Sequence, residues 1–320
     1  MLRYRADIRT LLWMLVFAPG LVALQYARPD LLPYLSWLSF YFAISASTIA
    51  HNHQHCPTFE NKTLNTLFSY WISIIYGFPT FAWIPTHNLN HHKYVNKPGD
   101  ATITWRFTNS HNYLVAASYF FVSSYYQSGP IKEFLAQTKE KNPERYWVYV
   151  SQYVVVIGAH LGLAALAVSL HGVGLGLTVY AFTLLFPAIV SLWTVMTFNY
   201  DQHVHTDPWS RYNHSRNFVS PVLNFLLFNN GYHTVHHENA ARHWSLAKEE
   251  HEKIKHLIDP SLNQKSMWLY WFKQYVLAPF FPSLGTKQIG RAPWDTGEGK
   301  LDLTTAPVGF GDTGTNVARV

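Results

Sequence analysis

Residues 146–200 read YWVYVSQYVVVIGAHLGLAALAVSLHGVGLGLTVYAFTLLFPAIVSLWTVMTFNY, and these 55 residues include no Asp, Glu, Lys or Arg. A helix that crosses a bilayer needs about 20 mostly apolar residues, so the stretch has room for two. The sequence His171-Gly-Val-Gly near its centre supplies a turn between them. The stretch therefore predicts a membrane hairpin with spans over 146–170 and 174–197.

Two further uncharged intervals near the N-terminus predict a second hairpin. They cover 10–27 and 31–59 and are separated by the short turn Arg28-Pro29-Asp30. The spans predicted here are 11–27 and 31–50. The fold class that follows is an all-α integral membrane protein with four transmembrane helices in two hairpins.

Three other stretches are apolar without resembling clean spans. Gly77 and Pro79 interrupt 63–92, and Asn, Ser and Tyr recur through 107–131, so both are predicted to be re-entrant or interfacial. Segment 267–282 is rich in aromatic residues, which favour the headgroup level of a membrane. We expect it to lie on the membrane surface.

The distribution of Lys and Arg orients the chain. Most of the basic residues before residue 146 lie in the N-terminal segment and in 51–145, which should therefore be cytoplasmic. Segments 51–145 and 199–266 would then form a cytoplasmic, histidine-rich cap on a single domain, 1–284. The remainder, 285–320, is rich in Gly, Thr, Pro and Asp, so it is predicted to be a flexible tail.

Histidines cluster beside the apolar stretches. The clusters are His51-Asn-His-Gln-His55, His87-Asn-Leu-Asn-His91-His92 and His233-Thr-Val-His236-His237, with a further element Asn199-Tyr-Asp-Gln-His203. Histidines spaced i, i+3 and i+4 share one face of a helix, and a neutral imidazole offers a lone pair to a transition metal. The single cysteine, Cys56, excludes an internal disulfide and a Cys-based iron–sulfur or zinc site supplied by this chain alone. The pattern predicts a histidine-ligated metal site.

Taken together, these boxes resemble the membrane-bound fatty acid desaturase and hydroxylase superfamily, the histidine-box diiron proteins. The resemblance covers roughly residues 30–245 and includes the position of the boxes relative to the spans. It implies two iron ions (Fe²⁺/Fe³⁺), with dioxygen as co-substrate. The ligands that it implies are His51, His55, His87, His91, His92, His203, His233, His236 and His237.

Several neighbouring residues are expected to support the ligands. The resemblance gives Asn199 a role through a bound water. Ligating histidines commonly donate their second nitrogen to a carboxylate. The carboxylates near the boxes are Asp100, Asp201, Asp207 and Glu238, of which Asp201 is preferred.

The other histidines are predicted to be structural or solvated. His53 and His205 lie two positions from expected ligands, so on a helix they face away from them. The remaining histidines outside the boxes are His111, His160, His171, His214, His243, His251 and His256.

The activity that follows from the resemblance is a dioxygen-dependent diiron desaturation of a fatty acyl chain. A hydroxylase or ketolase acting on lipids, alkanes or carotenoids with the same metal site is the alternative, because both reactions share the first hydrogen abstraction. A membrane metal transporter or sensor is a more distant alternative, although the expected spans lack the Asp and Glu that an ion path favours.

Partners follow from what the chain lacks. It carries no flavin or nucleotide fingerprint and no haem-binding domain, so electrons must come from a separate donor such as a ferredoxin or cytochrome b5. A lipid or fatty acyl substrate would enter from the membrane, and no nucleic acid partner is expected.

Overall fold

The computed structural model describes residues 1–297 as a largely helical chain made of two units. The first unit comprises Met1–Trp83 and Leu135–Val195, and the second comprises Ile84–Phe134 and the chain from Met196 onward. The predicted tail falls partly on 298–320, which lies outside the described residues.

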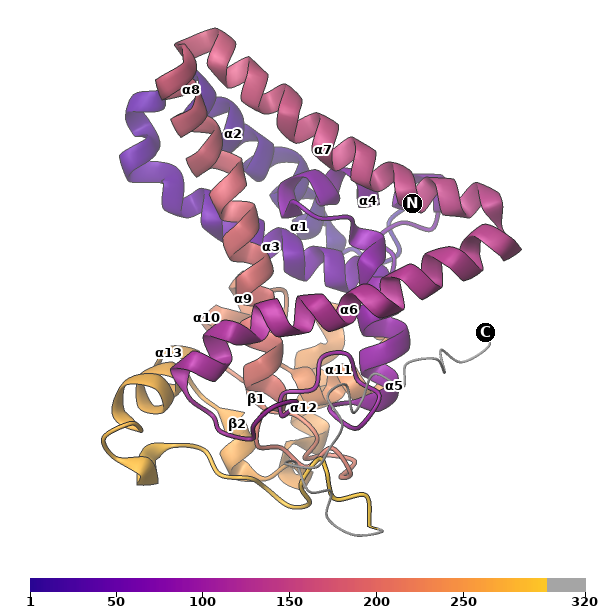
Figure 1. The fold of residues 1–320 in the computed structure, drawn as a ribbon, viewed down its shortest axis with the longest axis vertical. Helices are drawn as coiled ribbons and strands as arrows, with labels where there is room; N and C mark the ends of the chain where they lie inside the picture. The colour runs from indigo at the N-terminus through magenta and orange to yellow at the C-terminus, as the bar shows by residue number, and fades with distance from the viewer. Residues whose placement is uncertain (298–320) are drawn as a thin grey trace. The chain divides into compact units, whose positions relative to one another are not determined.

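The first unit consists of long helices. Its elements are α1 (Asp7–Leu11), a π-helical turn (Leu12–Phe17), α2 (Ala18–Ala27), α3 (Leu32–His55), α4 (Lys62–Tyr76), α7 (Pro143–His171), α8 (Val173–Tyr180), a second π-helical turn (Ala181–Leu185) and the start of α9 (Phe186–His203). Helices α7 and α8 lie side by side (Figure 1).

Local sequence signals explain where these helices begin and end. The Asn142 side chain accepts a hydrogen bond from the backbone N–H of Arg145, and Pro143 occupies the first turn of α7. Gly172, with φ of 75°, separates α7 from α8 because this backbone conformation, open to glycine, cannot continue a helix. Residues at the ends of α7 therefore determine where this helix begins and where the hairpin turns.

Three helical runs within residues 1–297 are long and apolar enough to cross a membrane. They are Asp7–Ala27, Pro143–His171 and Val173–His203. Each contains one of the predicted spans. The fourth prediction, 31–50, falls on the 24-residue helix α3, which is not among these three runs because Ser, Thr, Asn and His dilute its apolar residues.

The stretch 63–92 is broken as predicted from its Gly and Pro residues. The chain bends by 100° between Lys62–Tyr76 and Thr80–Tyr94, a geometry that fits either a broken span or a re-entrant loop. Gly77 ends α4 with φ of 79°. Most of residues 107–131, expected to be interfacial or re-entrant, fall within the 29-residue helix α6 (Tyr113–Lys141).

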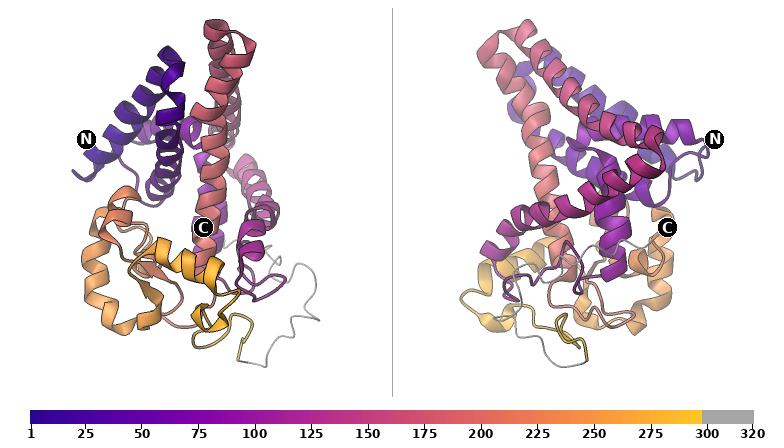
Figure 2. Two further views of the ribbon diagram at one scale, coloured as in Figure 1. Left: turned by 90° about the vertical axis from the view of Figure 1, so that its left-hand side faces the viewer. Right: turned by 45° about the vertical axis from the view of Figure 1, so that its right-hand side comes forward.

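Apart from most of helix α6, the second unit contains short elements. They are a π-helical segment (Ile84–His91), α5 (His92–Tyr94), β1 (Asn217–Phe218), α10 (Pro221–Leu226), α11 (His233–Glu238), α12 (Ala247–Ile254), β2 (Asn263–Gln264), α13 (Met267–Trp271) and a π-helical turn (Phe272–Leu277). Those that follow α9 are orange to yellow in Figure 2. Strands β1 and β2 pair in parallel, with Asn217 opposite Asn263.

One apolar cluster holds the C-terminal part of this unit together. It joins the end of α9 to β1, α10 and α13 through Phe198, Phe218, Leu223, Met267 and Tyr270. Segments far apart in the sequence thus pack around the end of α9, which carries His203.

Candidate metal centre

Three segments of the second unit bring their histidines together: Ile84–Tyr94, the C-terminal end of α9, and α11. The first of these is π-helical up to His91. Hydrogen bonds from i to i+5 widen its turn, so His87 and His92, five residues apart, come to lie on one side. Their Nε2 atoms are 3.1 Å apart.

Three buried histidines and the partly exposed His237 form the first group, and the centre of the group is His203. Its Nε2 atom lies 3.1 Å from that of His91, 2.9 Å from that of His233 and 3.2 Å from that of His237. One nitrogen from each ring lies within 4.8 Å of all the others. Such a group of converging nitrogens is able to hold a metal ion.

In two of these rings, the hydrogen-bond partner of Nδ1 indicates which ring nitrogen carries the proton. His91 Nδ1 lies 2.8 Å from a carboxylate oxygen of Asp100, and His203 Nδ1 lies 3.1 Å from the backbone carbonyl of His214. Both partners are acceptors when the carboxyl is ionised, so each Nδ1 carries the proton and each Nε2 is a bare lone pair. Two lone pairs facing each other at 3.1 Å repel, and a cation bound to both removes that repulsion. The residues therefore fit a metal ion.

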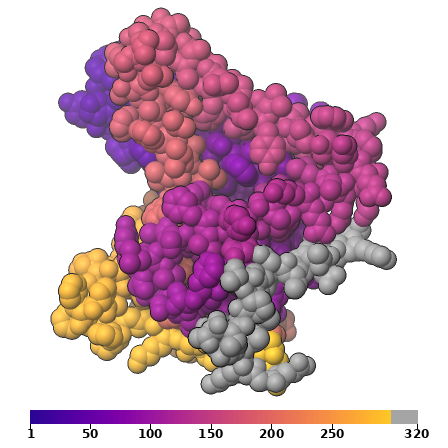
Figure 3. Space-filling model, in the orientation of Figure 1, coloured from indigo at the N-terminus to yellow at the C-terminus, as the bar shows by residue number. Residues whose placement is uncertain are grey.

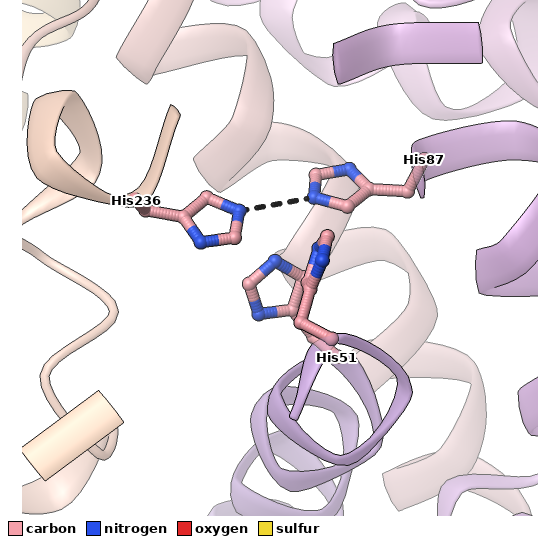
Figure 4. Close-up of side chains that lie close together, drawn as sticks. His51, His87 and His236 are labelled. Carbon is pink, nitrogen blue, oxygen red and sulfur yellow. Dashed lines mark hydrogen bonds between the residues drawn. The ribbon is translucent and has the colours of Figure 1, made fainter. Parts of the chain in front are cut away.

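A second group lies in the same unit. The Nε2 atoms of His87, His92 and His236 lie within 3.3 Å of one another, and Figure 4 shows the contact between His87 and His236. The residues come from the π-helical segment, α5 and α11. The two histidine groups thus share two supporting segments, Ile84–Tyr94 and α11, and α9 adds His203 to the first group only.

His51 and His55 belong to the first unit, at the C-terminal end of α3. They lie one turn apart with ring centroids separated by 4.8 Å, and Trp83 packs against the His51 ring. His53, between them, is turned toward Thr58 and the backbone carbonyl of Asn65, with which its two ring nitrogens make hydrogen bonds. His53 therefore faces away from His51 and His55, as the helical periodicity predicts.

Burial sets the charge of the groups at the site. Burial, reinforced by the neighbouring histidines, holds the pKa of His237 well below its ordinary value, so the ring stays neutral as a metal ligand must. Burial opposes ionisation of Asp100, but its interaction with the His91 N–H and hydrogen bonds from Thr102 and the Asn96 backbone outweigh burial and lower the pKa of the carboxyl. Asp100 is therefore an anion that lies directly beside the first histidine group.

Asn199 and Asp201 lie near the end of α9 but contact other partners. Asn199 Nδ2 donates to the hydroxyl of Tyr119 at 3.1 Å. The Asp201 carboxylate accepts hydrogen bonds from Trp271 Nε1 at 2.7 Å and from the Tyr275 hydroxyl at 2.5 Å. Asp201, preferred from the sequence as the partner of a ligand, thus ties α13 and the turn after it to α9. The carboxylate that contacts a ring of the first histidine group is Asp100.

Four more residues around His203 had no role in the sequence analysis or were treated there as structural. Arg216 is 1% exposed and donates to the carbonyls of Asp201 and Val204, which closes the C-terminal end of α9. The ring of His214 lies 5.2 Å from that of His237. Asn96 and Thr102 reach the same region through hydrogen bonds. No sequence spacing marks these residues, since their loops approach the ligands only after folding.

Two histidines away from the boxes, His111 and His205, make structural contacts. His205 bonds to Thr286 and to the carbonyl of Asn109, and His111 bonds to Thr286 and Tyr275. These contacts attach residues just after 284 to the second unit.

Comparison with curated proteins and with solved structures gave no significant match. The model of one protein family, described as fatty acid desaturase, does match, over residues 29–271. The matched range includes all four histidine elements and more than half of the chain. The chain therefore belongs to the fatty acid desaturase family.

Proposed function

We propose that this protein is a dioxygen-dependent diiron desaturase that introduces a double bond into the acyl chain of a lipid. Family membership implies oxidoreductase activity of the desaturase or hydroxylase kind. The observation that supports the proposal is the histidine group around His203, whose facing Nε2 atoms fit a bound cation.

We propose nine iron ligands, which include the two histidines of the first unit. They are His51, His55, His87, His91, His92, His203, His233, His236 and His237. Bound iron would supply the power to activate dioxygen and remove hydrogen from an unactivated C–H bond.

The rest of the chain holds these ligands in place and keeps water away. Asp100 holds the Nδ1 proton of His91, so that Nε2 remains a donor to the metal. Asn199 is proposed to hold a water molecule near the centre. Burial of His91, His203 and His233 to 3% exposure or less limits the access of bulk water.

The proposal includes a membrane location and two partners. We propose four spans, with α3 as the second, and a cytoplasmic N-terminus and metal centre, as the distribution of basic residues favours. The acyl substrate would come from the bilayer. A separate carrier, such as a ferredoxin or cytochrome b5, would supply the electrons.

The test uses full-length protein in lipid nanodiscs loaded with iron. We expect two irons per chain and, with dioxygen, a reductase–carrier pair and acyl lipids, an oxygen-dependent double bond detected by mass spectrometry. His91→Ala should abolish the product, whereas His256→Ala, at an exposed site outside the boxes, should retain it.

The alternatives predict different products. A hydroxyl group in place of the double bond would support the lipid hydroxylase reading and overturn desaturation. Bound zinc with no oxygen-dependent product, and no effect of His91→Ala, would overturn the oxygenase and favour metal transport or sensing.

A further inference from the structure

The loop Val95–Arg106, which we call the clasp loop, follows the second histidine cluster. Its first two residues adopt left-handed conformations, with φ of 45° at Val95 and 61° at Asn96. Such angles are rare outside glycine and strained for a β-branched residue, so the surrounding structure must hold them. Asn96 is fully buried.

One side of the clasp loop is bonded to the segment that carries His91. Asp100 Oδ2 contacts His91 Nδ1 at 2.8 Å and also accepts from the backbone N–H of Asn96 at 2.7 Å. The Asn90 side chain donates to the carbonyl of Gly99 and accepts from the N–H of Ala101. The loop and the segment that carries His91 are thus joined at several points.

The other side of the clasp loop reaches α9 through Asn96. Its Nδ2 donates to the backbone carbonyl of His203 at 3.0 Å, while its Oδ1 accepts from the N–H of Thr104 at 2.8 Å. Its own carbonyl accepts from Trp105 Nε1 at 2.8 Å. One buried residue therefore links the His203 backbone to the loop that holds the His91 ring.

We propose that Asn96 is a positioning residue that sets the separation of His91 and His203 at the metal centre; this inference rests on the proposed metal site. The two ligands lie on different segments, and metal–ligand distances tolerate shifts of only about 0.2 Å. Asn suits the position because it tolerates a left-handed backbone and offers a donor and an acceptor on one amide.

Two substitutions separate the parts of this role. Asn96→Gly keeps the left-handed backbone and the main-chain bonds to Asp100 and Trp105 but removes both side-chain bonds. Asn96→Asp keeps the acceptor for Thr104 and replaces the donor to His203 with an oxygen that repels its carbonyl. Thr104→Val is the matched control, since it removes only the 3.2 Å hydroxyl contact with Asn96 Oδ1 and leaves the bond to His203.

The experiment titrates metal-free full-length protein with Co²⁺ against a chelator and records the visible ligand-field spectrum. We expect both Asn96 variants to bind at least one of two Co²⁺ ions 10- to 100-fold more weakly than wild type, with a changed spectrum, because supporting contacts contribute on this scale. Thr104→Val should match wild type in both measurements. Thermal unfolding of the metal-free proteins shows that each variant is folded.

Two results would overturn the inference, and they differ in what they say of the proposed function. If the folded Asn96 variants match wild type in Co²⁺ affinity and spectrum, Asn96 is only structural and the metal centre stands. If the wild type itself binds no Co²⁺, the proposed metal centre fails together with this inference. Acyl desaturation plays no part in the measurement, so absence of that activity leaves the inference intact.

Discussion

At the scale of the residue, the metal centre depends on which ring nitrogen of each histidine holds the proton. Asp100 fixes this for His91, and its two oxygens are both occupied by donors: His91 and the Asn96 N–H on one, the Thr102 N–H and hydroxyl on the other. A carboxylate can accept at both oxygens, but an amide cannot.

Asp100→Asn should therefore weaken metal binding about 10- to 100-fold, because one pair of donors would face an NH₂ group. Chelator competition with iron or Co²⁺ measures the affinity. Glu238→Gln is the control, since Glu238 forms a surface pair with Arg211 and should leave the affinity unchanged. Equal affinities for Asp100→Asn and wild type would contradict the role of Asp100.

Burial of His111 should make the stability of the folded protein depend on pH. Burial, opposed by the hydrogen bond and charge of Asp201, lowers its pKa from 6.5 to about 4. Between these values the unfolded chain binds a proton that the folded protein excludes, so stability falls as the pH drops from about 6.5 to about 4. His111→Gln should reduce this loss by roughly 3 kcal/mol, as judged from unfolding of the metal-free protein across this range. Parallel pH profiles for the two proteins would rule the effect out.

At the scale of the element, the segment from α13 to Leu277 has two different faces. Met267, Tyr270 and Gln274 are buried, whereas Trp268, Phe272 and Val276 are 49–70% exposed at spacings of four residues. Figure 3 shows this segment, in yellow, at the surface of the second unit. An exposed aromatic row of this kind is typical of a membrane-interface helix.

We therefore predict that Trp268 contacts lipid in nanodiscs. Brominated acyl chains should quench its fluorescence, so Trp268→Phe should remove a clear share of the quenchable emission. Trp105→Phe is the comparison, since Trp105 is 1% exposed and should contribute little to that share. Quenching that is unaffected by Trp268→Phe would place the segment away from the bilayer.

The bend in the stretch 63–92 should require glycine at residue 77. A Cβ at this residue would lie 2.4 Å from the Cβ of Ala188, and φ is 79°, so Gly77→Ala meets both a steric clash and backbone strain. We expect a loss of roughly 1–3 kcal/mol in stability. Gly129→Ala, in α6 with nothing within 4 Å of the added methyl, should be neutral or slightly stabilising. Unfolding in detergent compares the two, and equal effects would contradict the prediction.

At the scale of the whole molecule, bound metal should contribute to stability, because histidine nitrogens that repel one another in the metal-free protein would share a cation. Removal of metal with a chelator should lower the unfolding temperature, and added Fe²⁺ should restore it in a concentration-dependent manner. His203→Ala should lose most of this response, since His203 contacts three other ligands. An unfolding temperature that is indifferent to chelator and iron would argue against a metal centre.

The sequence by itself predicted the family, the helical class and four spans, three of which fall on runs long and apolar enough to cross a membrane, because absence of charge and histidine spacing are local properties. Tertiary structure decided what surrounds the ligands. Asp100 rather than Asp201 contacts the ring of a proposed ligand, and Asn96 and Arg216 hold the end of α9, because hydrogen-bond partners depend on how loops distant in sequence pack. Periodicity can say which residues share a helix face, but only packing determines which carboxylate or amide that face meets.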